Sequence, residues 1–351
     1  MNPSPEARSP SRVRSLDALF RSVAAGATLA ALGACGGGGD GATPAPPPPA
    51  PSPAPAPAGP IAAQLTVPTP VGYDAERLAA FDRLNEIRLS AGLGMLAQNT
   101  LLDQAAQAHA DWIIANDSFT HEETAGTTGF TGVRWWDRDE AVGYVPVGGD
   151  ELMAGPVHGA QGVDVLVNAV YHRAGMLAFE PVDVGIGWSG GSATTVSMPL
   201  VLDLASPGSD PIRGLGQAAT ASINGVAIWP LDAARGVPRR LGLEDPDPVP
   251  GQDVSSLGTP VSITVSGDKT IAVASFVLTN LTAGEIVGTQ LLTAQSDPNS
   301  LIRGSFAALI PLSPLLPNTT YSVAFSGSTV QFPSVTPVSI ARTWTFSTAL
   351  E

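Results

Sequence analysis

A long tract without core-forming residues limits where this chain can fold. Between residues 36 and 60, 16 of 25 positions are glycine or proline and six more are alanine. Such a tract cannot bury enough apolar surface to form a core, and its Pro-Ala alternation favours an extended polyproline conformation. Folding is therefore confined to residues 61–351, which are long enough for two domains, and the tract is predicted to be a spacer.

The segment before the spacer has the features of a lipoprotein signal peptide. Four arginines among the first 21 residues precede ten small or apolar residues, 23–32. Ten helical residues span only about 15 Å, half the hydrocarbon core of a bilayer, so a secretory signal fits better than a membrane span. Leu32-Gly33-Ala34-Cys35 then resembles a bacterial lipobox, in which the cysteine becomes the lipidated N-terminus. The alternative is a lone thiol after an ordinary signal sequence.

These features predict the start of the mature chain. We expect residues 1–34 to be a cleaved signal peptide, and residues 35–60 to be a lipidated cysteine followed by a linker. Cys35 would attach the exported protein to a membrane. Gly36, rather than aspartate, follows the cysteine, which by the same resemblance favours the outer membrane or surface of a Gram-negative cell.

Charge and cysteine content exclude two other classes of protein. The formal net charge is −14, and Lys269 is the single lysine. An acidic chain without a basic stripe repels phosphate backbones, so no nucleic-acid partner is expected. One cysteine cannot form an internal disulfide framework.

The composition of the chain changes near residue 250. Residues 61–250 carry ten arginines, 23 acidic residues and all four histidines, whereas residues 251–351 carry eight charged residues and no histidine. Alternating prolines between Asp245 and Gly251 deny backbone donors to any helix or sheet. We therefore expect one domain over residues 61–245, which carries the chemistry, and a second over residues 251–351.

Hydrophobic periodicity predicts an α+β first domain. Apolar positions spaced by three and four indicate a helix over residues 74–91 and a second from Asn99 to near Asn116. A third helix is expected over residues 163–176. The β-rich runs 182–188, 194–205 and 225–230 are predicted to be strands of one antiparallel sheet. Residues 185–191 also match dinucleotide and hydrolase glycine motifs, but no helical pattern follows them, so they are predicted to be a hairpin turn.

A series of short motifs runs in order through residues 74–235. They are Leu84-Asn85-Glu86-Ile87-Arg88, Ala91-Gly92-Leu93, His109-Ala110, Phe119-Thr120-His121, Gly129-Phe130-Thr131-Gly132, Glu151 and Tyr171-His172-Arg173. Their order and spacing resemble bacterial members of the CAP superfamily, the SCP-like group that includes cysteine-rich secretory proteins, antigen 5 and pathogenesis-related proteins. The resemblance implies an α-β-α sandwich with a cleft where two histidines and two acidic residues meet.

The resemblance also assigns residues to that cleft. His121 matches the histidine after the second helix, Glu151 matches the glutamate of the family's Gly-Glu-Asn segment, and His172 matches the second histidine. The fourth, acidic position departs from the family, because the chain has only Asn168 and Ala169 there. If the cleft is catalytic, His121, Glu151 and His172 are the residues expected to act.

The chemistry of these side chains leaves three uses open. Histidine titrates near neutral pH, and a neighbouring carboxylate orients its ring. Two histidines and one glutamate are also the ligands of an open zinc site, so the same three residues could hold a divalent cation such as zinc. No compact metal motif supports that use. The third use is structural hydrogen bonding in a solvated cleft.

Three aromatic or imidazole side chains outside the set have their own interpretations. Trp135 and Trp136, beside Arg134, could stack on a carbohydrate or contact lipid, and the alternative is packing between a helix and a loop. His109 lies on the apolar stripe of the second helix and is predicted to be a core or cleft-wall histidine.

The last hundred residues alternate with period two, which is typical of sandwich strands. Residues 316–321 and 344–348 resemble the final strands of bacterial Ig-like modules, so a small all-β sandwich is expected after the α-β-α domain. Such modules are spacers or adhesion surfaces.

Together these features predict an envelope-anchored protein that binds rather than catalyses. The expected ligand is small and apolar, a lipid or a surface glycan, held near His121, Glu151 and His172. One alternative is a hydrolase in which a histidine or a metal-bound water is the base or nucleophile. The other is a structural adhesin in which the cleft has no function.

Overall fold

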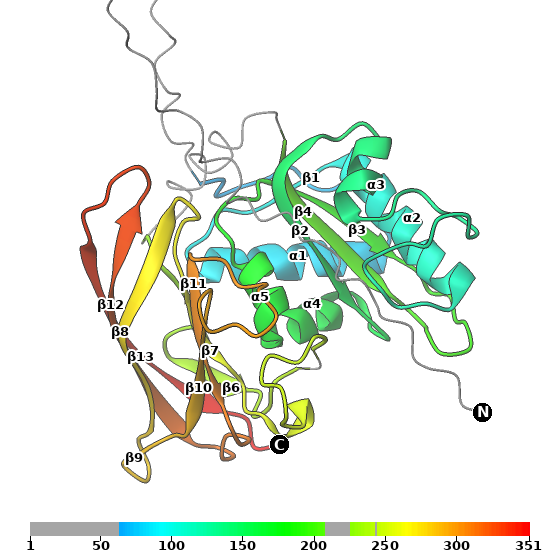
Figure 1. The fold of residues 1–351 in the computed structure, drawn as a ribbon. Helices are drawn as coiled ribbons and strands as arrows, with labels where there is room; N and C mark the ends of the chain where they lie inside the picture. The colour runs from blue at the N-terminus through cyan, green and yellow to red at the C-terminus, as the bar shows by residue number, and fades with distance from the viewer. Residues whose placement is uncertain (1–62, 208–224, 243) are drawn as a thin grey trace, which may run out of the picture. The chain divides into compact units, whose positions relative to one another are not determined.

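The computed structural model describes residues 63–207, 225–242 and 244–351 of the chain (Figure 1). The predicted signal peptide, Cys35 and the Gly/Pro spacer lie outside the described residues. Within the described ranges, no helix is long and apolar enough to cross a membrane.

The first two helices begin where local capping predicts. Helix α1 spans Ala75–Ser90, and the Asp74 side chain accepts the Arg77 N–H at its start. Helix α2 spans Thr100–Asn116, with Asn99 as the N-cap that accepts the Leu101 N–H. An N-cap acceptor satisfies a backbone donor that the helix itself leaves unpaired, so both starts follow from the local sequence.

The third predicted helix is two helices, so the prediction of one helix over residues 163–176 was wrong. Helix α4 spans Gly159–Asn168 and helix α5 spans Val170–Met176. The backbone of Ala169 between them is extended, with ψ of 134°. A further short helix, α3, spans Trp135–Ala141.

A four-stranded sheet forms the middle layer of the first domain. Its strand order is β1-β3-β4-β2. The strands are β1 (Ala97–Gln98), β2 (Pro146–Ala154), β3 (Asp183–Trp188) and β4 (Leu200–Pro207). Strand β4 pairs antiparallel with both β3 and β2, and β1 pairs parallel with β3.

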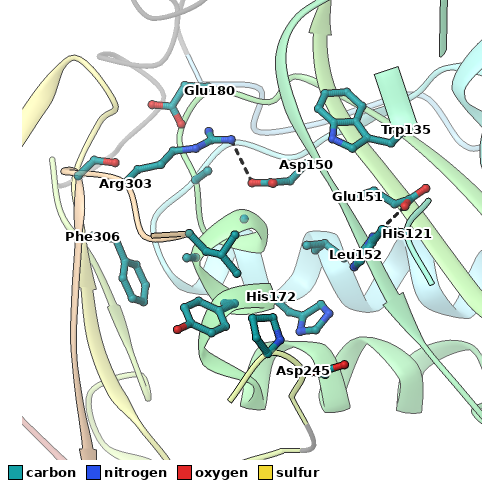
Figure 2. Close-up of a pocket in the computed structure, with 17 residues that line it drawn as sticks. His121, Trp135, Asp150, Glu151, Leu152, His172, Glu180, Asp245, Arg303 and Phe306 are labelled. Carbon is teal, nitrogen blue, oxygen red and sulfur yellow. Dashed lines mark hydrogen bonds and ion pairs between the residues drawn. The ribbon is translucent and has the colours of Figure 1, made fainter. Parts of the chain in front are cut away.

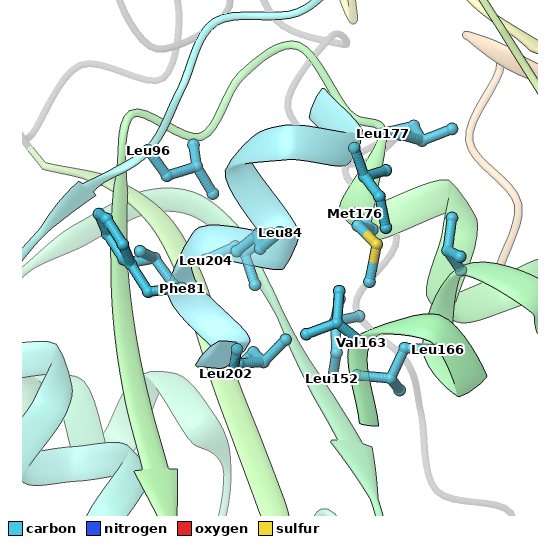
Figure 3. Close-up of a cluster of buried hydrophobic side chains, with 14 of the residues drawn as sticks. Phe81, Leu84, Leu96, Leu152, Val163, Leu166, Met176, Leu177, Leu202 and Leu204 are labelled. Atoms are coloured by element: carbon cyan, nitrogen blue, oxygen red, sulfur yellow. The ribbon is translucent and has the colours of Figure 1, made fainter. Parts of the chain in front are cut away.

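Alternate side chains of β4 pack on opposite layers of helices. Leu202 and Leu204 belong to a core cluster with Phe81 and Leu84 of α1 and with Leu166 of α4 (Figure 3). Val201 belongs to a separate cluster with the apolar stripe of α2. Because successive strand residues point to opposite faces, helices cover both faces of this sheet. The domain is therefore α+β, with a sheet between helical layers.

The chain continues into a β-rich region, defined here as the described residues from 225 to 351. Its first sheet has the order β10-β11-β7-β5 and its second the order β6-β13-β12-β8-β9. The strands of the first sheet are β5 (Ala227–Trp229), β7 (Val261–Thr264), β10 (Thr289–Thr293) and β11 (Phe306–Pro311). Those of the second are β6 (Ala234–Val237), β8 (Lys269–Asn280), β9 (Glu285–Ile286), β12 (Thr320–Gln331) and β13 (Val338–Thr348). A 3-10 turn, η2, spans Val254–Ser256.

One predicted strand lies in a different sheet from the one expected. The run at residues 225–230 forms β5, which pairs with β7 and not with β3 or β4. Strand β6 likewise pairs with β13. The sheets of the β-rich region therefore contain residues that precede Asp245. Local sequence identifies a strand here but carries no information about its partner.

Candidate functional site

His121 and Glu151 form a hydrogen-bonded pair. His121 lies in the loop after α2, and its Nδ1 is 2.8 Å from Oε1 of Glu151 on β2. The other oxygen of Glu151 accepts a hydrogen bond from the Arg138 guanidinium on α3. The Glu151 side chain is buried, whereas that of His121 is 48% exposed. The carboxylate is thus held from behind, and the imidazole faces outward.

Glu151 is ionised despite its burial. Burial alone would raise its pKa, but the hydrogen bond with His121 and the charges of His109 and Arg138 act the other way and lower the pKa overall. An ionised Glu151 orients the His121 ring by accepting a hydrogen bond from Nδ1–H.

His172 has a different carboxylate partner. It lies on α5, and its Nδ1 is 3.1 Å from Oε1 of Glu244, a residue of the β-rich region. The same carboxylate accepts the backbone N–H groups of Val170, Tyr171 and His172. Sequence reasoning missed Glu244, because it looked for the fourth acidic residue beside His172 in the chain, and Glu244 lies 72 positions away.

The three predicted residues line one cavity as members of two pairs. His121, Glu151 and His172 all line a cavity of about 340 Å³, and Arg303 of the β-rich region lies across it from them (Figure 2). Leu301 also lines this cavity. Arg303 lies 3.3 Å from Asp150 across this cavity's rim. His121 and His172 are therefore both at the cavity, each joined to its own carboxylate.

A second, wider cavity shares this pair of histidines. It measures about 670 Å³, and His121, His172 and Asp245 line both cavities. Its other walls are mostly apolar and include Phe119, Met153, Pro156, Val157, Val165, Leu166, Ala169 and Val254. We call the two cavities together the histidine cleft.

His109 supports the loop that carries His121. It is fully buried on α2, as predicted, with Nδ1 3.0 Å from Glu123 and Nε2 3.0 Å from the Thr120 carbonyl. Glu123 also accepts the Thr131 N–H. Both ring nitrogens are thus used to fix residues 120–123. Sequence reasoning found this histidine but not its glutamate partner.

A buried acidic cluster lies behind Glu151. Asp203 faces Glu151 across the β2–β4 ladder, and Asp139 on α3 is also fully buried. Burial first, then the charge of Glu151, raises the pKa of Asp139 to about 7. The same two causes, with Asp139 added, raise the pKa of Asp203 well above its usual value. Arg138 is the cation that acts on all three carboxyl groups.

The two tryptophans lie differently toward the cleft. Their rings meet edge to face, with centroids 5.4 Å apart. Trp135 lines the smaller cavity. Trp136 is 37% exposed, and the Arg134 guanidinium lies 5.1 Å from its ring centroid. Of the pair, Trp135 is the one placed to touch a ligand in the cleft.

The open donor atoms fall short of a resident zinc centre. Both oxygens of Glu151 and of Glu244 already accept hydrogen bonds. The Nε2 atoms of His121 and His172 remain, whereas catalytic zinc sites use three protein ligands. In the part of the chain that the structure describes, no group of three or more His, Cys, Asp or Glu side chains is placed to hold a metal ion. Zinc binding stays a prediction that metal analysis of the purified protein can check.

The α+β fold of the first domain, with its sheet between helical layers, is the fold expected of a CAP domain. Residues 81–201 match the family model described as "CAP: Cysteine-rich secretory protein family", and they form the CAP domain of this protein. Glu244 lies 43 residues beyond the end of that match.

Two solved structures of bacterial proteins are similar to parts of the chain. One is an outer surface protein from Borrelia burgdorferi, with 15% identity over 36% of this chain and 90% of that one, and a TM-score of 0.31. The other is an "extracellular protein containing a SCP domain from Bacillus anthracis str. Ames", with 18% identity over 37% of this chain and 40% of that one, and a TM-score of 0.32. No curated protein sequence matches the chain.

Proposed function

We propose that this chain is an exported CAP-domain protein, held at the cell envelope by a lipid on Cys35, that binds a small and largely apolar ligand in the histidine cleft. The observation that carries the proposal is the shared lining of the two cavities. His121 and His172 line both the cavity of about 670 Å³, whose other walls are mostly apolar residues, and the cavity of about 340 Å³, whose lining includes Asp150 and Arg303. Both volumes are in the range of small-molecule sites, which combine apolar walls with a few polar groups.

The two imidazoles supply the polar contacts of this site. Each has its Nδ1 beside a carboxylate, so in its neutral form each ring presents Nε2 as a hydrogen-bond acceptor. A ligand with an apolar body and one hydroxyl or amine would place the body in the wider cavity and donate a hydrogen bond to a histidine. A surface glycan that stacks on Trp135 is the alternative ligand class.

A small apolar probe tests the wider cavity. Gln161 is an exposed residue of α4 that lines this cavity, so Gln161→Trp should fill its mouth without disturbing the core. We expect 1-aminoanthracene to bind the full mature chain in isothermal titration calorimetry, and Gln161→Trp to weaken binding at least tenfold, about 1.4 kcal/mol.

A matched substitution controls for the added indole. Gln104 is an exposed residue of α2 that lines neither cavity of the cleft, and Gln104→Trp should leave the affinity unchanged. If the probe does not bind, or if both variants weaken it equally, apolar binding in the cleft is wrong. Mass spectrometry of material that co-purifies with the chain would then decide between a glycan and an empty cleft.

A hydrolase is the second candidate, favoured by the same histidine–carboxylate pairs. An imidazole whose Nδ1 is held by a carboxylate can accept a proton at Nε2, which is the part of a general base. Hydrolysis of p-nitrophenyl butyrate that is lost in both His121→Ala and His172→Ala would support this activity. A rate equal to that of buffer with the unaltered chain would argue against it.

The membrane attachment is tested separately. Cys35→Ser removes the thiol that a lipid would modify, so we expect the variant to leave the membrane fraction and become soluble after export. The unaltered chain should stay with the membrane until detergent is added. An unchanged distribution for Cys35→Ser would show that the chain is held in another way.

A further inference from the structure

Glu244 joins the β-rich region to the CAP domain at a single carboxylate. One oxygen lies 3.1 Å from His172 Nδ1, and the same oxygen accepts the N–H groups of Tyr171 at 2.7 Å and His172 at 3.2 Å. The other oxygen accepts the N–H of Val170. The Glu244 side chain is buried, whereas that of His172 is 15% exposed.

The need for this carboxylate arises at the start of α5. The first N–H groups of a helix have no partner within it, and Ala169, the residue before α5, has no side chain that could cap them. Glu244 supplies the missing acceptors. This explains why the chain can break between α4 and α5 at Ala169 without leaving buried donors unpaired.

The segment that carries Glu244 is fixed by contacts of its own. The Gly242 N–H donates to the Asn168 carbonyl, and the Asn168 side chain donates to the Arg240 carbonyl at 2.7 Å. Because these bonds do not involve the Glu244 side chain, a substitution at this position leaves the segment attached to the end of α4.

The hydrogen-bond pattern determines the tautomer of His172. The oxygen that faces Nδ1 already accepts two backbone N–H groups, so it is an acceptor, and Nδ1 must carry the hydrogen between them. In the neutral ring, Nε2 then holds the lone pair. The arrangement matches that of His121, whose Nδ1 faces the Glu151 carboxylate at 2.8 Å.

From this geometry we propose that Glu244 is the positioning residue of His172, and that the β-rich region thereby completes the histidine cleft. Glu244 orients the ring, selects the Nδ1–H tautomer and leaves Nε2 as the acceptor for a ligand. Its importance for binding rests on the proposed function. The tautomer itself does not, and it can be measured without any ligand.

Nuclear magnetic resonance of the full mature chain tests the proposal directly. In protein labelled with nitrogen-15 in its histidines, long-range correlations distinguish the two tautomers of each neutral ring, and His172→Gln assigns the signal. We expect the Nδ1–H form for His172 in the unaltered chain. In Glu244→Ala that form should cease to be the major one, because free imidazole prefers Nε2–H.

Two further variants separate positioning from a general effect on the fold. Glu244→Gln should retain the Nδ1–H form, because the amide oxygen can replace the Glu244 oxygen that accepts three hydrogen bonds. Asp245→Ala, at an exposed neighbour that lines the same cavities, should also retain it. In all variants the His121 signal should stay unchanged.

Either of two results would overturn the proposal. One is an Nε2–H ring at His172 in the unaltered chain, which needs no variant to fold. The other is an unchanged Nδ1–H form in folded Glu244→Ala. Failure of 1-aminoanthracene to bind would contradict the proposed function but leave the tautomer result standing, so the two ideas can fail separately.

Discussion

Asp139 is a single residue through which the stability of the chain is expected to depend on pH. It is fully buried beside Glu151, and its pKa is raised to about 7 from an ordinary value of 3.8. Between about pH 4 and pH 7, Asp139 is therefore protonated in the folded chain and ionised in the unfolded chain. The stability that this group contributes is fully present below about pH 4 and is lost as the pH rises through 7.

Asp139→Asn should remove this dependence. Between pH 5 and pH 8 we expect the free energy of unfolding of the unaltered chain to fall by about 2 kcal/mol more than that of the variant. Urea unfolding at the two pH values measures the difference. Asp82→Asn, at an exposed residue of α1, is the control and should follow the unaltered chain. Parallel pH profiles for Asp139→Asn and the unaltered chain would contradict the assignment.

Two glycines of β3 set the distance between a helix and the sheet. A Cβ on Gly185 would lie 2.1 Å from the Leu102 carbonyl carbon, and one on Gly187 would lie 2.2 Å from the Ala106 carbonyl oxygen. These are backbone atoms of α2, which cannot move aside alone. The glycines that spell a dinucleotide motif are therefore needed for close packing of α2 on β3.

Gly185→Ala should separate these two elements. We expect a loss of about 3 kcal/mol in the free energy of unfolding, because the added methyl group would clash with backbone atoms that can move only if the whole helix shifts. Gly148→Ala on β2, where a Cβ would meet nothing within 4 Å, should cost little. Urea unfolding of both variants at one pH makes the comparison, and equal stabilities would refute the packing argument.

At the scale of elements, features set by neighbouring residues could be predicted, and features set by residues far along the chain could not. Asp74 and Asn99 cap α1 and α2 from within the local sequence, so those helices could be placed to within a residue. The break at Ala169 depends on Glu244, which accepts the Val170 N–H, and the sheet that β5 joins is determined by its pairing with β7. Both partners are distant in sequence, and a single sequence does not reveal such pairings.

The candidate site divides in the same way. His121, Glu151 and His172 could be named in advance because they fall within recognisable short motifs. Their partners could not, because Arg138 reaches Glu151, and Glu244 reaches His172, only through the folding of α3 and of the β-rich region. Sequence reasoning expected one set of three residues. In the folded chain, His121 pairs with Glu151 and His172 pairs with Glu244, and both pairs lie at one cleft.

Across the whole molecule, the CAP domain and the β-rich region share a core. Val170 of α5 packs in one buried cluster with Leu257, Ile302 and Phe306. The buried Arg173 side chain also donates to the Pro260 carbonyl at 2.7 Å. Removing the later strands would expose this apolar surface and leave a buried guanidinium without its acceptor.

A chain ending at residue 245 should therefore be much less stable than the full chain. It also lacks β7 and β13, the partners of β5 and β6. We expect its melting temperature, followed by circular dichroism, to be lower by about 10 °C or more, or its cooperative transition to be lost. A chain ending at residue 349 is the control. Equal melting temperatures for the two would mean that the CAP domain is stable alone.

Strand β4 has a consequence for the chain before it folds. Its residues 200–205 are wholly buried, and all but Asp203 are apolar. An unfolded chain exposes this run to other copies, and runs of this kind drive aggregation unless a charge interrupts them. Asp203 is ionised in water at neutral pH and becomes hard to ionise only once it is buried. We therefore expect the charge of Asp203 to oppose aggregation of the unfolded chain, although burial makes the same charge unfavourable in the folded one.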